Sequence, residues 1–448
     1  MMNNTRFYTR RQWLHRSLQL ALGTSQASAF GPLLLASLGR TAHADIFASL
    51  DSPWSMESGP FFVLIRATGG LDCVLGLDPQ ILPPDATEKD LFIGYRPEEI
   101  ATNGNIRLGP AATPLLKHAE SLAVINGVYM GSPANHEIMN SYASSGAMDG
   151  NAQSLAVELD ATQKHPMPKG VIHADAGIQT GSRKSAVISD VRNMSELNES
   201  PFKDLLEKNA DNKNQPSSAL EIAKQGASIS NRKLADTIRK LNERRFESET
   251  EKTNTLITQA FLLGLSKSSQ ISLNIGLSLD THTDHLRQHL PGQRSGVWEP
   301  VSKLFDLFKS IPLDEAQGIS LFDRTLFMVC NEFSRTPYLN DSSGKDHNGD
   351  TNSFLLAGYG IRGGNTFGAS TLDTRASKRY REGADARHRA QYMNFKTGEL
   401  RAPETAGFEL LRPEHITRSV AKIFDDPADF SSVDLNRVPV IPGLIKET

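Results

Sequence analysis

The sequence predicts an α/β fold in which a mostly parallel sheet is covered by helices on both faces. Short, largely apolar runs recur along the chain, and each has the length of a strand buried on both faces. These runs are 61–65, 122–127, 272–277, 325–330 and 354–358. Segments with helical periodicity lie between them, for instance 111–119 and 301–309. Strands that alternate with helices are typical of a parallel sheet.

Composition and charge narrow the class of protein. The chain has 448 residues, of which 38% are hydrophobic and 22% charged, so a collagen, a coiled coil and a wholly disordered chain are excluded. The first 44 residues contain five arginines and no acidic residue. Without those five, 43 of the 48 Lys and Arg remain against 51 acidic residues, which gives a net charge of −8. Such a charge disfavours sequence-independent binding to nucleic acid, and we expect no nucleic-acid partner.

Residues 1–44 have the features of a cleaved export signal. Arg10 and Arg11 stand before an uncharged stretch at 17–39, and Ala42-His43-Ala44 has the small-x-small pattern of a cleavage site. The stretch is too polar for a good membrane anchor, and weak hydrophobicity beside paired arginines is typical of a twin-arginine signal. An ordinary secretory signal and an uncleaved anchor are the alternatives. We expect the twin-arginine export machinery as a partner, a mature chain of 45–448 that is periplasmic or secreted, and no stable membrane span after cleavage.

The mature chain has one segment of different composition. Residues from about 195 to 266 are rich in Lys, Glu, Asn and Ser and show a long helical pattern at 220–265, which predicts a helical insertion. A surface excursion is expected at 373–405, and a helix at 412–424 with Pro413 in its first turn.

Acidic and histidine side chains follow the ends of the predicted strands at four places, and a fifth group lies in the polar loop before the predicted strand at 354–358. Ligands of such sheets bind beyond the carboxyl ends of the strands. Carboxylates and imidazoles that converge there suit divalent metals, because without a cation like charges would face each other. Asp72 has a second interpretation, in which it accepts hydrogen bonds from the amides of its own turn. The segments are Asp72, Asn135-His136-Glu137, Asp280-Thr281-His282, Asn331-Glu332 and Asp346-His347.

Other polar residues near these segments have two interpretations each. Ser132 is interpreted as a helix N-cap because Pro133 suits the first helical position, and a nucleophile is the alternative. His285 and His289 stand four residues apart and are interpreted as a solvated helix face rather than a second metal site. Arg335 either closes an ion pair within its loop or holds an anion.

The chain has two cysteines, Cys73 and Cys330, which are too few for a disulfide scaffold or a zinc finger. They are interpreted as two buried, unpaired thiols. A single disulfide is the alternative, since an exported location would allow it.

Six motifs along the chain occur together in one known family. They are Gly69-Gly70-Leu71-Asp72, Asn135-His136, Asp280-Thr281-His282, the run 331–337, Gly344-Lys345-Asp346-His347 and the loop 358–364. In this set and order the mature chain resembles the exported bacterial proteins of domain of unknown function family 1501, which is grouped with the alkaline phosphatase superfamily of phosphatases, sulfatases and phosphomutases. The resemblance implies an alkaline phosphatase-like α/β sandwich with one or two divalent metal ions (zinc, magnesium, manganese or calcium) at the strand ends.

The resemblance also implies metal ligands. It assigns Asp72 to one metal, and Asp280, His282 and His347 to the other. Glu332 stands where the superfamily usually has an aspartate that binds the first metal. Phe333 stands where a histidine ligand often follows. The first metal would therefore have one ligand fewer.

The implied catalytic residues depart from the family pattern. Asn135 stands where many relatives carry serine, and an amide cannot form a phospho- or sulfo-enzyme intermediate as a hydroxyl does. Asn135 would instead hold an oxyanion, or Ser132 would supply the hydroxyl from one turn earlier. Arg335 would hold the non-transferred oxygens of an ester through its planar guanidinium.

Two functions follow from these expectations. The first is an exported metal-dependent hydrolase of phosphate or sulfate esters, in which metal-activated water replaces the missing serine and the partner is a small anionic ester. The second is a non-catalytic exported protein that keeps the fold and binds a partner or a surface polymer.

Overall fold

The computed structural model describes the chain in segments. They are residues 60–82, 94–131, 135–150, 152–162, 170–173, 186–188, 245–262, 266–273, 279–372, 388–402, 404–425 and 434–447. The predicted export signal, Ser132 and most of the predicted insertion lie outside these residues. No helix in the described segments is both long enough and apolar enough to cross a membrane.

A central sheet of eight strands has the order β14-β4-β13-β10-β1-β7-β5-β6. Strand β13 runs antiparallel to both of its neighbours, and the other pairs are parallel. The predicted mixed α/β fold with a mostly parallel sheet is therefore confirmed. The strands are β1 (Phe61–Ala67), β4 (Leu122–Ile125), β5 (Gly170–His173), β6 (Ala186–Ile188), β7 (Ser268–Leu273), β10 (Thr325–Cys330), β13 (Phe354–Gly358) and β14 (Asn365–Phe367).

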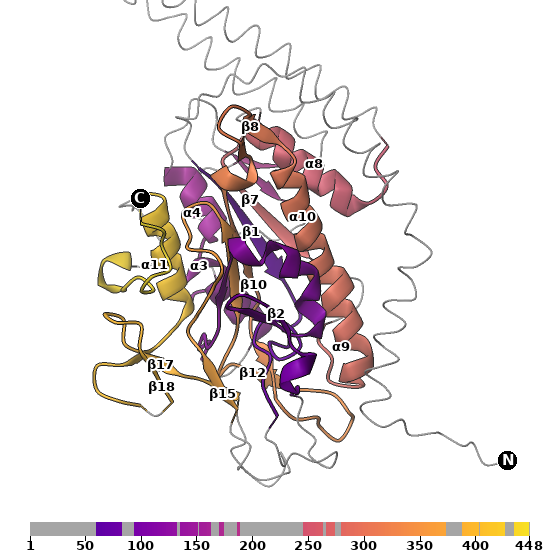
Figure 1. Cartoon of the computed structure of the whole chain (residues 1–448), viewed down its shortest axis with the longest axis vertical. Helices are drawn as coiled ribbons and strands as arrows, with labels where there is room; N and C mark the ends of the chain where they lie inside the picture. Colours follow the sequence, from indigo (N-terminus) through magenta and orange to yellow (C-terminus); the bar gives the residue numbers. More distant parts are fainter. Residues whose placement is uncertain are drawn as a thin grey trace, which may run out of the picture.

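Helices cover both faces of this sheet, as Figure 1 shows. One face packs against α8 (Glu249–Leu262), α10 (Glu299–Lys309) and the 3₁₀ helix η3 (Pro110–Ser121), and the other against α3 (His136–Ser145), α4 (Leu155–Thr162) and α11 (Pro413–Ile423). Strand β1 divides its side chains between the two cores, with Val63 and Ile65 on the first face and Phe62 and Leu64 on the second. This alternation follows from the two-residue period of a strand.

Shorter elements complete the described structure. Helix α9 (His285–Gln293) continues through the π-helical turn η4 (Arg294–Trp298) into α10. The paired short strands are β2 (Ala101–Asn103) with β3 (Ile106–Leu108), β8 (Pro312–Asp314) with β9 (Ile319–Ser320), β11 (Ser334–Arg335) with β12 (His347–Asn348), β15 (Ser370–Leu372) with β16 (His388–Ala390), and β17 (Tyr392–Met393) with β18 (Leu400–Arg401) and β19 (Glu409–Leu410). Single 3₁₀ turns are η2 (Pro97–Glu99), η5 (Phe322–Arg324) and η7 (Leu435–Arg437).

Two predicted elements differ from the structure. Strand β7 begins four residues before the predicted 272–277, because its first residues are polar yet buried and carry no apolar signal. The predicted helix at 111–119 is a 3₁₀ helix, and Pro114 inside it lacks the N–H that an α-helix would use there. Helix α11 has Pro413 in its first turn, as predicted. Helix α8 lies within the described end of the predicted insertion.

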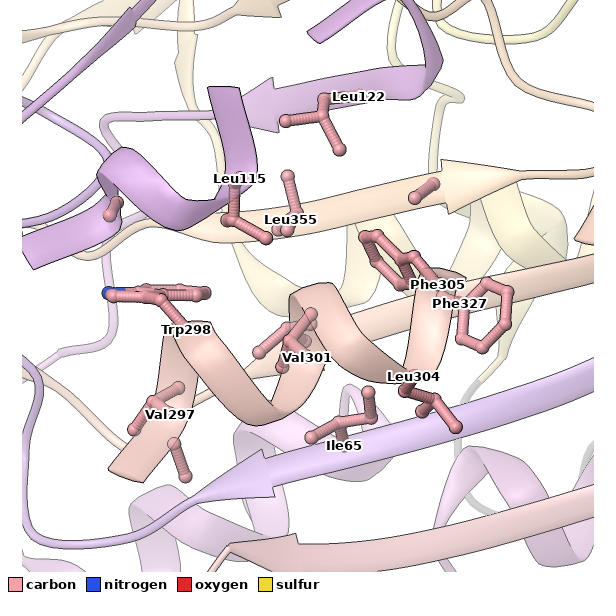
Figure 2. Packing of buried hydrophobic residues seen from close by; sticks show 14 of the residues in the cluster. Ile65, Leu115, Leu122, Val297, Trp298, Val301, Leu304, Phe305, Phe327 and Leu355 are labelled. Atoms are coloured by element: carbon pink, nitrogen blue, oxygen red, sulfur yellow. The ribbon is translucent and has the colours of Figure 1, made fainter. Parts of the chain in front are cut away.

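The core beneath α10 fixes this helix against the sheet. In Figure 2 Leu304 lies beside Ile65 of β1 and Phe305 beside Phe327 of β10, whereas Trp298, from η4, lies on the side of Leu115. The Phe305 ring meets the Phe327 ring of β10 with centroids 4.9 Å apart and planes inclined by 60°. Edge-to-face contacts of this kind stabilise by about 0.5–1.5 kcal/mol beyond the burial of the rings. Helix α10 thus packs against the neighbouring parallel strands β1 and β10, whose carboxyl ends are followed by the polar residues.

Candidate metal centre

The polar residues gather at the carboxyl ends of three adjacent parallel strands. The segments after β1, β7 and β10 supply Asp72, Asp280 and Glu332 respectively. Strands β11 and β12 form an antiparallel ribbon in which Arg335 pairs with His347. Helix α3 begins at His136. The predicted convergence of these five segments at one edge is therefore what the structure shows.

Four of these side chains form a group that we call the histidine cluster: His136, Asp280, His282 and His347. The Oδ1 atom of Asp280 lies 3.1 Å from His282 Nε2 and 3.2 Å from His347 Nε2. The two Nε2 atoms are 3.2 Å apart, and His136 Nε2 lies 3.5 Å from Asp280 Oδ2. His136, Asp280 and His347 each offer one ligand atom, and these three atoms lie within 4.8 Å of one another.

These spacings suit a metal ion. Ligand atoms about 2.0–2.1 Å from a tetrahedral zinc lie roughly 3.3 Å apart, close to the separations within the cluster. Three imidazoles and a carboxylate are a nitrogen and oxygen set that zinc and other first-row divalent metals accept. The four side chains are between 24% and 44% exposed, while Nε2 of His136 itself is buried and has no hydrogen-bond partner in the described structure. The residues present therefore fit one divalent cation.

Glu332 lies behind His136. Its Oε1 atom accepts hydrogen bonds from His136 Nδ1 at 2.9 Å and from the Gly69 amide at 2.6 Å. Its Oε2 atom is buried with no hydrogen-bond partner among the described residues. A carboxylate on one ring nitrogen commonly orients a histidine so that the other nitrogen faces a metal. Glu332 also raises the pKa of His136, since it stabilises the protonated ring.

Phe333 forms an aromatic wall beside the cluster. Its ring stacks on His347 with centroids 4.2 Å apart and lies 4.8 Å from the ring of His136. The wall approaches the Gly69-Gly70 turn so closely that a Cβ on Gly70 would lie 2.6 Å from the Phe333 ring. Gly70 also has a φ of +74°, so only glycine fits there without strain. The position where the resemblance expected a histidine ligand thus packs against two histidines.

The Arg335 side chain forms hydrogen bonds within the protein. This buried guanidinium donates from Nε to the Gly70 carbonyl at 3.1 Å, from Nη1 to the Lys345 carbonyl at 3.2 Å, and from Nη2 to Asp280 Oδ1 at 2.6 Å. Nη2 also donates to the carbonyls of Gly69 and Leu279. These contacts correspond to the loop-closing interpretation and not to the anion-holding one. Burial alone would raise the pKa of Asp280, but the hydrogen bond and charge of Arg335, with His347 and His282, lower it to about 2.

A second polar group, which we call the lysine network, lies beside the histidine cluster. It consists of Asp72, Thr281, His285, His289 and Lys345, all buried. Asp72 Oδ2 lies 2.6 Å from Lys345 Nζ and 2.9 Å from His285 Nε2. Burial opposes ionisation of Asp72, but Lys345 and His285 hold its pKa far below the ordinary value. For Asp72 the sequence predicted a metal ligand or, as the alternative, an acceptor for the amides of its own turn; in the structure Oδ1 accepts from the Val74 amide at 3.0 Å, as in that alternative, and Oδ2 pairs with Lys345.

The interpretation of His285 and His289 as a solvated face is wrong. Both rings are fully buried and stack on each other with centroids 4.4 Å apart. Burial lowers the pKa of His285 to about 4 and that of His289 well below the ordinary value. Spacing along a helix does not reveal which face is covered, and here the covering partners are Asp72 and Thr281.

The start of α3 also differs from the prediction. Asn135 is the N-cap, and its side-chain oxygen accepts from the amides of Glu137 at 2.9 Å and Ile138 at 3.3 Å. Ser132, the predicted cap, lies outside the described residues, and α3 begins four residues after it. Asn135 brings its neighbour His136 into the histidine cluster. The sequence placed His136 among the polar side chains expected at this edge, but it did not single out His136 as a metal ligand.

The two cysteines are confirmed as buried, free thiols. Burial raises the pKa of Cys73 and Cys330 to about 12 each, so neither is a reactive thiolate at neutral pH.

Comparisons with known proteins bear on part of the chain. A family model described as a protein of unknown function (DUF1501) matches residues 315–382, which agrees with the resemblance over the segment that carries Glu332, Arg335, Lys345 and His347. No curated protein matches the chain. Among solved structures, Ps i-CgsB is similar at 9% identity and a TM-score of 0.33, covering 70% of this chain and 69% of that one. The lipoteichoic acid synthase LtaP from Listeria monocytogenes is similar at 8% identity and a TM-score of 0.30, covering 74% of each chain.

Proposed function

We propose that the protein is a metal-dependent hydrolase of phosphate or sulfate esters whose centre is the histidine cluster. One observation carries the metal: His136, Asp280 and His347 present ligand atoms within 4.8 Å of one another at a solvent-accessible edge of the sheet. The ester class comes from the resemblance of the motifs. A bound divalent cation would act as a Lewis acid that polarises an ester oxygen.

The chain's own residues have separate tasks in this proposal. His136, Asp280, His282 and His347 bind the cation, and Glu332 orients His136 through the Nδ1 hydrogen bond. Arg335 positions the carboxylate of Asp280 rather than holding the ester. Asp346 accepts a hydrogen bond from His282 Nδ1 at 3.1 Å, which leaves Nε2 of that ring for the metal.

Two measurements test this proposal. The first is the metal content of the purified mature chain, and the second is its turnover of a panel of aryl phosphate and sulfate esters with and without chelator. Asp280→Asn is the loss variant. Asp306→Asn is its matched control, because Asp306 is a half-exposed aspartate on α10 that pairs with Lys117. We expect metal and turnover in the wild type and the control, and neither in Asp280→Asn.

The second candidate is a non-catalytic binding protein. It is favoured by Asn135, whose amide oxygen is used in the helix cap and which offers no hydroxyl. A metal-loaded wild type that turns over no ester of the panel would support this candidate against the hydrolase.

A further inference from the structure

The resemblance implied up to two cations, and the place of one of them beside Asp72 holds a lysine. The Asp72 carboxylate and the Lys345 ammonium are both 0% exposed and lie 2.6 Å apart. Both carboxylate oxygens have donors from the protein. Oδ1 accepts from the Val74 amide at 3.0 Å, and Oδ2 accepts from His285 and Lys345. A lysine ammonium is a compact point charge, so it compensates a buried carboxylate much as a small cation does.

The rest of the lysine network forms a closed cycle of hydrogen bonds. Only one assignment of donors and acceptors satisfies the whole cycle. The Asp72 amide donates to His289 Nε2 at 2.9 Å, so His289 carries its proton on Nδ1 and donates to Thr281 Oγ1 at 3.0 Å. The Thr281 hydroxyl then donates to His285 Nδ1 at 2.6 Å, and His285 Nε2 donates to Asp72 Oδ2. Each ring nitrogen has one role, and both rings are neutral.

This cycle of hydrogen bonds leaves no imidazole nitrogen available to bind a metal. His289 Nε2 and His285 Nδ1 accept protein hydrogen bonds, and the other two ring nitrogens carry protons. A metal at Asp72 would have to displace Lys345 and remove the proton of His285 Nε2. The residues present therefore do not fit a cation beside Asp72.

The lysine network also holds the segments that carry the metal ligands. Thr281 stands between Asp280 and His282, and its carbonyl accepts from the Lys345 amide at 3.0 Å. Gly344, next to Lys345, packs so closely on the His282 carbonyl that a Cβ would lie 1.8 Å from it.

We propose that Lys345 takes the place of a second metal ion beside Asp72, so that the chain binds a single divalent cation, in the histidine cluster. The statement rests on the proposed function for that one cation. The chemistry assigned here is a site with one metal and one fixed ammonium, in contrast to the two-cation site that the resemblance allows.

Titration with Zn²⁺ and with Mn²⁺, followed by calorimetry and by metal analysis after gel filtration, tests the proposal on the full mature chain. The informative variant is Asp72→Asn/Lys345→Met, which removes both charges together and so leaves neither one buried and unpaired. Asp280→Asn removes a cluster ligand, and Asp306→Asn is the control. Circular dichroism reports whether each variant is folded.

We expect one metal per chain in the wild type, the control and the double variant, with affinities within about threefold, and a loss of more than about 100-fold in Asp280→Asn. Two metals per wild-type chain, one of them lost in the double variant, would overturn the role of Lys345 and leave the proposed function standing. A single metal that the double variant loses and Asp280→Asn retains would place the ion at Asp72 and overturn both. If the double variant does not fold, the number of metal ions bound per wild-type chain decides between the outcomes, since two metal ions per chain would contradict the proposal.

Discussion

The histidine cluster and the lysine network lie side by side at one edge of the sheet, and both are built from aspartate and histidine. In the lysine network every side chain is buried, and the charge of Asp72 is balanced by Lys345. In the histidine cluster the side chains are partly exposed, and several ligand atoms crowd around Asp280. The same residue types thus serve two purposes, and burial together with one lysine decides which.

The difference teaches where a cation is expected. A buried carboxylate that has a fixed ammonium and a complete set of hydrogen bonds needs no metal, because its desolvation is already compensated. In the described structure the buried Nε2 of His136 has no hydrogen-bond partner, nor has Oε2 of the adjoining Glu332, which marks the histidine cluster as the less satisfied group.

Removal of a ligand from the histidine cluster has the largest expected effect. His347→Ala should weaken metal binding by more than about 100-fold and abolish ester turnover, because Nε2 of His347 lies among the converging ligand atoms. The free energy of unfolding of the metal-free protein should change little, since this ring is partly exposed. Calorimetry and the ester assay measure the first two quantities. Unchanged metal affinity in a folded variant would remove His347 from the centre.

Removal of the lysine should instead affect stability. Lys345→Ala leaves the buried carboxylate of Asp72 unpaired, for which we expect a loss of about 3–5 kcal/mol in the free energy of unfolding. The double variant Asp72→Asn/Lys345→Met should lose clearly less, because neither charge remains. Denaturant titration of the metal-free proteins gives both values. Equal losses in the two variants would argue against a stabilising charge pair.

The pH dependence of stability should report the lysine network. The pKa of His285 falls from 6.5 to about 4 on folding, chiefly by burial, which outweighs the hydrogen bond to Asp72 and is aided by repulsion from Lys345 and Arg335. Between these values the unfolded chain binds the proton and the folded protein does not, so stability is lost as the pH falls from about 6.5 toward about 4. At 1.36 kcal/mol per pKa unit the loss is at most about 3 kcal/mol.

His285→Gln keeps a side-chain N–H donor and cannot titrate. We expect a weaker dependence of unfolding free energy on pH between about 6.5 and 4 in this variant than in the wild type, measured by denaturant titration at several pH values. Parallel curves for the two proteins would show that His285 is not the titrating group.

The helix cap next to the cluster should have the smallest effect. Asn135→Ala removes the acceptor for two amides at the start of α3 and should cost about 1 kcal/mol of stability. Asn135→Asp keeps an acceptor oxygen and should restore most of that loss. A large fall in turnover in Asn135→Asp, without a fall in stability, would return Asn135 to the predicted role of holding an oxyanion.

Much of the fold could be predicted because its central strands are short apolar runs. Strands β1, β10 and β13 occur where the apolar pattern placed them, since both of their faces are buried. Strand β7 was misplaced because Ser268 and Gln270 are buried polar residues, whose environment depends on tertiary contacts. The short β11–β12 ribbon has two residues in each strand, too few for any periodicity.

The edge that carries the site could also be predicted, but not its division into two groups. Asp280, His282 and His347 were expected at this edge from their positions near strand ends, the family resemblance assigned them to one metal, and they do converge. The pairing of Asp72 with Lys345 depends on how the loop after β11 folds back, which no local pattern encodes. His136 could not be singled out from Asn135 and Glu137, because a position after a strand end does not show which side chain of the segment faces the other ligands.

Anomalous diffraction from crystals of the protein grown with Zn²⁺ or Mn²⁺ would locate the bound metal directly. We expect one metal peak per chain, within bonding distance of His136 Nε2, Asp280, His282 Nε2 and His347 Nε2, and no peak beside Asp72 and Lys345. A peak in contact with the Asp72 carboxylate, with Lys345 displaced from it, would contradict the account.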